Sequence, residues 1–148
     1  MKQKFSILLA QQLPLLEDAA KMLAISQQRC KQIGIKENYT IDELEKFEAL
    51  TSRFVRLCDF IIQKMLRLID EIDLETQGTV RDRIHRAEKK GLIKSAEQFA
   101  DCRLLRNEIA HEYTQTKILK IFKNVLEMTP NLLDSVENIK QYCQHYQN

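Results

Sequence analysis

Residues 44–72 read LEKFEALTSRFVRLCDFIIQKMLRLIDEI, and this stretch decides the fold. Its core-facing positions recur in alternating steps of three and four, which is the spacing of one face of an α-helix. These positions are Leu44, Phe47, Thr51, Phe54, Cys58, Ile61, Met65, Leu68 and Ile72. Further apolar residues widen the stripe and predict contacts on more than one side. We therefore favour the central helix of a bundle over a coiled-coil partner site.

The rest of the 148-residue chain is also typical of helices, with three Gly, two Pro and no Trp. Capping boxes at Thr40/Glu43 and at Ser95/Gln98 predict two helix starts. Gly34 and Gly91 predict two helix ends. The sequence predicts an all-α fold, an antiparallel bundle of about five helices that forms one domain over residues 1–148.

Two prolines lie within the predicted helices. Pro14 predicts either a kink or the first turn of the main N-terminal helix. The apolar rhythm of the last helix, residues 118–146, continues through Thr129 and Pro130. This predicts one helix kinked at Pro130, or two nearly coaxial helices for which Thr129 is the second cap.

The composition of the chain argues against several classes of function. The formal net charge of +2 indicates no nucleic-acid binder by itself. The four cysteines, at 30, 58, 102 and 143, have no short spacing and are predicted to be reduced core residues of a cytoplasmic protein. Neither a signal peptide nor a stretch of membrane-spanning length is found, so we expect no membrane association. Scattered histidines and isolated glycines predict no metal site and no cofactor.

The segment from Arg103 to Tyr113 carries the unusual chemistry. As a helix, it would place Arg106 in the middle of an apolar stripe, where a guanidinium is costly unless an anion or several acceptors meet it. That stripe comprises Phe99, Cys102, Leu105, Ile109, Ala110 and Tyr113. A second, milder face comprises Ala100, Leu104, Asn107 and His111. The alternative to a functional site is that Arg106 has a structural role and that His111 packs at a helix end.

A short basic helix precedes this segment at residues 80–90. Arg81, Arg83 and Arg86 are interpreted either as part of a solvated face or, together with Arg103, as a rim that contacts phosphate.

Arg106-Asn107-x-x-x-His111-x-Tyr113 is an R-x4-H-x-Y motif near the end of the penultimate predicted helix. In this position it resembles the signature of HEPN domains, and most closely that of the HepT toxin group. The partner of a HepT toxin is a minimal nucleotidyltransferase (MNT) antitoxin. The resemblance covers the chain from about Leu44 to Tyr146.

The resemblance implies a homodimeric, metal-independent ribonuclease that is the toxin of a type VII-like toxin–antitoxin pair. His111 would act as general acid–base on RNA, Arg106 would neutralise the phosphate, and Asn107 would hold Arg106 or the motif backbone in place. Tyr113 would be the residue that the MNT partner adenylylates to silence the toxin.

Helical geometry points to a dimer independently. Arg106 and His111 would lie about 140° apart around one helix. The two side chains of a single chain could therefore contact the same phosphate only if the helix unwinds near His111. A two-fold copy would also bring the groups together. Two alternatives stay open, a non-catalytic substrate-binding or regulatory subunit of a nucleotidyltransferase and a structural helical adaptor.

Overall fold

The computed structural model describes residues 2–111 and 115–146 and is all-helical in these ranges. Long rods are formed by α1 (Lys2–Ile33), by α2 (Ile41–Asp59) with its continuation, and by α6 (Gln115–Cys143). The continuation of α2 is a π-helical segment, η1 (Phe60–Met65), followed by α3 (Leu66–Ile72). The shorter helices are α4 (Val80–Lys89), α5 (Ala96–His111) and a final 3₁₀ turn, η2 (Gln144–Tyr146). Counting α2, η1 and α3 as one rod and leaving aside the final 3₁₀ turn, the described residues form five helices, as predicted.

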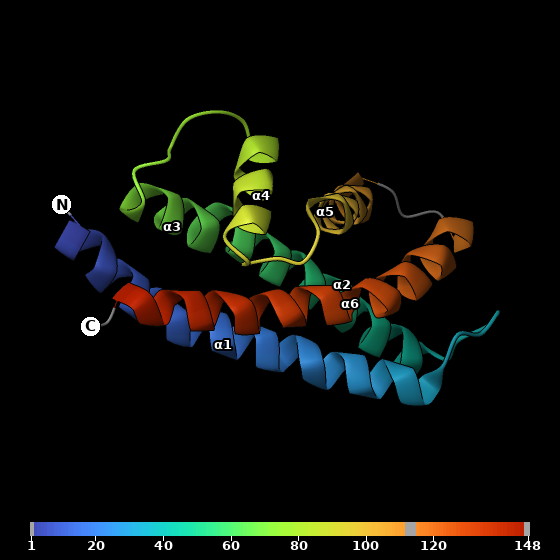
Figure 1. The fold of residues 1–148 in the computed structure, drawn as a ribbon. Coiled ribbons are helices and arrows are strands. Elements are labelled where there is room, and N and C mark those ends of the chain that lie inside the picture. Colours follow the sequence, from blue (N-terminus) through green and yellow to red (C-terminus); the bar gives the residue numbers. More distant parts are fainter. Residues whose placement is uncertain (1, 112–114, 147–148) are drawn as a thin grey trace.

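Figure 1 shows the arrangement of the rods. The rods α1, α2–α3 and α6 lie lengthwise against one another, and α1 runs in the direction opposite to the other two. Helices α4 and α5 lie together on one side of this layer, and α5, seen nearly end-on, crosses the direction of α1. One cluster of buried side chains includes members from all of these helices. The pair α4–α5 thus packs against this layer.

The α1 helix contributes a repeat of seven residues to the core. Leu9, Leu16, Leu23 and Cys30 are all at most 2 % exposed. The helix begins at Lys2 and continues through Pro14, so the prediction that Pro14 marks a first turn is wrong. Gly34 ends the helix in the left-handed conformation (φ 80°), as predicted, and its N–H donates to Cys30 O at 2.9 Å.

The central rod departs from the predicted α-helical spacing. Its buried residues come in adjacent pairs at intervals of four, and these pairs are Leu57/Cys58, Ile61/Ile62, Met65/Leu66 and Ile69/Asp70. A straight α-helix would rotate the last pair by about 120° from the first, because it has 3.6 residues per turn. The π segment η1 absorbs one extra residue and removes most of this offset. The predicted position Leu68 is only partly buried, and its neighbours Ile69 and Asp70 are buried in its place.

The π segment leaves one carbonyl for α4 to satisfy. Leu66 N–H, which in an α-helix would reach Ile62 O, donates to Ile61 O instead. Arg83 on α4 fills the gap, because its Nη1 donates to Ile62 O at 3.2 Å. The Nε of the same guanidinium lies 3.7 Å from Oδ2 of the buried Asp70. Arg83 therefore joins α4 to the π segment.

We predict that Arg83→Met destabilises the fold by about 1–3 kcal/mol, the usual cost of leaving a buried polar group without its partner. The matched control is Arg81→Met on the same helix, where the side chain is exposed. This change should alter stability by about 0.5 kcal/mol or less. Urea unfolding measures both, and equal losses would show that Arg83 makes no special contribution.

A cluster of opposite charges fixes α4 to the rest of the fold. Buried Asp70 accepts from Arg86 Nη2 at 2.9 Å and from Lys90 Nζ at 3.2 Å. Lys90 also lies 2.8 Å from Asp73. The Asp73 carboxylate in turn accepts from Tyr142 at 2.8 Å and from Tyr146 at 2.6 Å. The cluster thus ties the C-terminal end of the chain to α3 and α4.

We predict that this cluster makes the fold sensitive to acid. Burial alone would raise the pKa of Asp73, but hydrogen bonds from Lys90, Tyr146 and Tyr142 outweigh burial and hold the pKa below its ordinary value. A carboxyl with a lowered pKa stabilises the fold above its unfolded pKa, and the stabilisation is lost as pH falls through the folded pKa. Asp73→Asn should therefore lower the free energy of unfolding at pH 7 and flatten its decline below about pH 4, both measurable in urea. A decline as steep as in the wild type would contradict this.

Helix α6 is continuous, and all four cysteines lie in the core. Helix α6 passes through Pro130 as one helix, and Figure 1 shows it bending in its middle part. Thr129 is not a cap, because it is fully buried and its hydroxyl donates to Val125 O at 2.6 Å. All four cysteines are buried and free, as predicted. Burial raises the pKa of the Cys58, Cys102 and Cys143 thiols to about 12.

Candidate functional site

The Arg106 guanidinium is paired with the carboxylate of Asp59, at the end of α2. Nε donates to Oδ1 at 2.7 Å and Nη2 donates to Oδ2 at 2.9 Å, a two-point pair with the planar geometry that arginine favours. The Arg106 side chain is 30 % exposed and that of Asp59 is 41 % exposed. The hydrogen bonds that Arg106 donates to the Asp59 carboxylate raise the pKa of Arg106. Of the two predicted kinds of partner for Arg106, an anion or several acceptors, the chain itself supplies an anion.

The pair with Asp59 orients the Arg106 guanidinium but uses only some of its N–H donors. Arginine has five N–H groups, and the bonds to Asp59 use two of them. The other three make no hydrogen bond within the described residues. Asp59 therefore holds Arg106 in one orientation, and the opposite edge of the fork can meet a phosphate or carboxylate.

Asp59 was not among the predicted site residues. Its signal is visible in the sequence, because it is the one charged residue in the run from Leu57 to Ile62. Periodicity gave no reason to bring it to Arg106, which lies 47 residues further along the chain. Only the packing of α5 against α2 makes the contact.

The helix α5 extends to His111 and presents it to solvent. His111 and Asn107 are both exposed, and Leu104 on the same side of α5 is 60 % exposed. Phe99, Cys102, Leu105 and Ile109 are buried as predicted. Ala110 is exposed, so its assignment to the apolar stripe is wrong. Because the helix is continuous from residue 106 to 111, it does not unwind to bring Arg106 and His111 together.

The predicted phosphate contacts occupy different environments. Arg81 is exposed, whereas Arg83 and Arg86 are half-buried and directed at Asp70. Arg103 is half-buried on α5, one turn before Arg106. Tyr113 lies outside the described residues.

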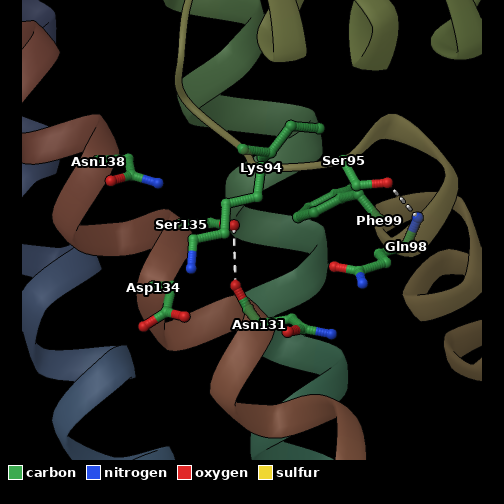
Figure 2. Close-up of a pocket in the computed structure, with 9 residues that line it drawn as sticks. Lys94, Ser95, Gln98, Phe99, Asn131, Asp134, Ser135 and Asn138 are labelled. Atoms are coloured by element: carbon green, nitrogen blue, oxygen red, sulfur yellow. Dashed lines mark hydrogen bonds between the residues drawn. The ribbon is translucent and has the colours of Figure 1, made fainter.

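Two depressions lie between α5 and α6. Figure 2 shows the first, where Ser95, Gln98 and Phe99 face a row of polar residues on α6 that includes Asn131 and Asn138. Its free volume of about 20 Å³ has room for about one water molecule, which excludes a nucleotide as its ligand. The second, of about 390 Å³, lies at the other end of α5 and is lined by Glu108, Lys117, Lys120, Ile121 and Asn124.

We predict a measurable coupling between Asp59 and Arg106. A double-mutant cycle of Asp59→Asn, Arg106→Gln and the combined variant should give a coupling free energy of about 1 kcal/mol in urea unfolding, the upper part of the range for partly exposed ion pairs. The cycle with Lys46→Gln in place of Arg106→Gln is the control, because Lys46 pairs with Asp42. A coupling no larger than in the control would contradict the pair.

The described residues contain no group of three or more His, Cys, Asp or Glu side chains placed to hold a metal ion. None of the helices in those ranges combines the length and apolar character that a membrane crossing requires. A scan against models of protein families and a search of curated proteins both found no match to this chain.

Proposed function

We propose that this chain is a metal-independent endoribonuclease of the HEPN type, the toxin of a HepT-like pair that a minimal nucleotidyltransferase silences by adenylylating Tyr113. The observation that carries the proposal is the oriented Arg106. A two-point pair with Asp59 fixes the guanidinium, and the same helix presents an exposed His111. A histidine can supply acid–base catalysis to RNA cleavage through the ribose 2′-hydroxyl, and a fixed cation can stabilise the charge that builds on the phosphate.

In this proposal His111 takes the proton of the 2′-hydroxyl or gives one to the leaving 5′-oxygen, and water, or the His111 of a second copy, carries out the other of these two proton transfers. The 2′-oxygen attacks the adjacent phosphorus, the bond from phosphorus to the 5′-oxygen breaks, and the products are a 2′,3′-cyclic phosphate and a 5′-hydroxyl. Arg106 stabilises the negative charge that builds on the phosphate oxygens, and Asn107 supports the motif. The fixed direction of Arg106 lowers the cost of reorganisation during the reaction.

A homodimer fits this chemistry better than a monomer. Arg106 and His111 lie about 140° apart around a helix that does not unwind between them. A two-fold copy would place the His111 of one chain beside the Arg106 of the other. The exposed Leu104, on the same side of α5 as His111, would lie in the interface. Sedimentation of wild type and Leu104→Glu measures this, and a wild-type monomer that cleaves RNA would contradict it.

We predict that the purified chain, free of any partner, cleaves single-stranded RNA in EDTA and leaves 2′,3′-cyclic phosphate ends. His111→Ala should lower the rate by at least 100-fold, because general acid–base catalysis contributes about 10²–10⁴-fold. His85→Ala, at an exposed histidine on α4, is the matched control and should cleave like the wild type.

Cleavage by His111→Ala at the wild-type rate would refute the assignment of His111. If the unmodified wild type is inactive, the chain is a non-catalytic partner of a nucleotidyltransferase or a structural adaptor, and the Asp59–Arg106 pair has no role in catalysis. Mass spectrometry of Tyr113 shows whether the sample was unmodified.

A further inference from the structure

The depression of about 390 Å³ between α5 and α6 has the size of a small-molecule site, since such sites measure about 300–1,000 Å³. Four of its lining residues, Lys117, Lys120, Ile121 and Asn124, follow one another at steps of three, one and three on α6. This spacing places them on one face of the helix. Glu108 on α5 forms the opposite wall.

The lining offers the mixture of groups that a nucleotide needs. Lys117 and Lys120 both line the depression and stand three residues apart on α6. Buried Ile121 gives an apolar floor, and the half-buried Asn124 carries both a donor and an acceptor. The Glu108 carboxylate repels a phosphate and can accept a hydrogen bond from a base amino group. The α6 wall therefore favours the phosphate, and the Glu108 wall favours the base.

The depression also lies beside His111. Glu108 precedes His111 by three residues on the same continuous helix, which puts the two side chains about 60° and 4.5 Å apart along α5. A nucleotide in the depression would therefore be a close neighbour of the phosphate at His111.

We infer that this depression is a binding subsite for one nucleotide of single-stranded RNA, next to the phosphate that is cleaved. The inference rests on the proposed ribonuclease function and adds the substrate contacts to it. Lys117 and Lys120 bind the phosphate of this nucleotide, Ile121 contacts the base, and Asn124 and Glu108 hydrogen-bond to the base edge.

The test measures binding separately from cleavage. The probe is a fluorescein-labelled decamer of mixed-sequence 2′-O-methyl RNA, which has no nucleophilic 2′-hydroxyl and stays intact. Fluorescence anisotropy with the full chain at several salt concentrations gives the affinity and its salt dependence. The variant is Lys117→Gln/Lys120→Gln. The control is Lys21→Gln/Lys31→Gln, which removes the same charge from exposed positions on α1.

We expect the α6 variant to bind at least ten-fold more weakly. The slope of log affinity against log salt should be smaller by about 0.7, since the two lysines neutralise one phosphate and each neutralised phosphate of a single strand contributes about 0.7. The α1 control should keep the wild-type slope and bind within two-fold of the wild type. Asn124→Ala, which changes no charge, should weaken binding at an unchanged slope, and circular dichroism verifies that each variant is folded.

Equal losses in the α6 variant and the α1 control would overturn the subsite and leave the ribonuclease proposal standing. The expected pattern of binding in a chain that cleaves no RNA would support the subsite and overturn the ribonuclease. A wild type that does not bind the decamer at any salt concentration would overturn the subsite, and the cleavage assay then decides the ribonuclease separately.

Discussion

The π segment in the central rod is the constraint on which the other contacts depend. Asp59 and Asp70 are eleven residues apart, and an uninterrupted α-helix would turn them to within about 20° of each other, toward the same neighbour. The extra residue in η1 offsets the second carboxylate by about 100°. As a result Asp59 meets Arg106 on α5, whereas Asp70 meets the basic side chains of α4.

The wider turn exposes a backbone carbonyl, and the neighbouring helix satisfies it. Arg83 donates to Ile62 O, and the same side chain faces Asp70. Through Arg83, α4 therefore contacts both the carbonyl that the π segment exposes and the carboxylate that it reorients. Residues of α4 that look in sequence like a phosphate-binding rim are thereby divided. Arg83 and Arg86 face the buried carboxylate, as does Lys90 directly after α4, and Arg81 faces solvent. Such a charge cluster is costly to break once buried, because removing one partner leaves the other uncompensated.

The consequence for function is a rigid support for α5. Helix α5 contacts α2, α4 and α6, and one edge of it carries the oriented Arg106 while the opposite side presents His111, Asn107 and Leu104 to solvent. Reactive groups are positioned most accurately when packed neighbours lock their rotamers. The proposed chemistry draws on this rigidity for Arg106 and on a second copy for His111.

The sequence by itself determined the helices and most of the core. The apolar spacing placed the long rods, and Thr40 with Glu43 and Gly34 set boundaries that the structure confirms. These features are local, since a cap or an amphipathic stripe is decided by residues within a few turns. The same reasoning indicated that Arg106 needed an anion or several acceptors beside it.

Only the tertiary structure decided that the partner of Arg106 is the Asp59 carboxylate. It also decided that Asp70 is buried, that the central rod includes a π turn, and that Ala110 faces solvent. Acidic residues are rarely buried, so sequence reasoning does not assign one to a core unless its partners are known. Those partners come from α4, and the partner of Arg106 lies 47 residues away. Contacts over such separations depend on how helices pack, which the spacing within one helix does not encode.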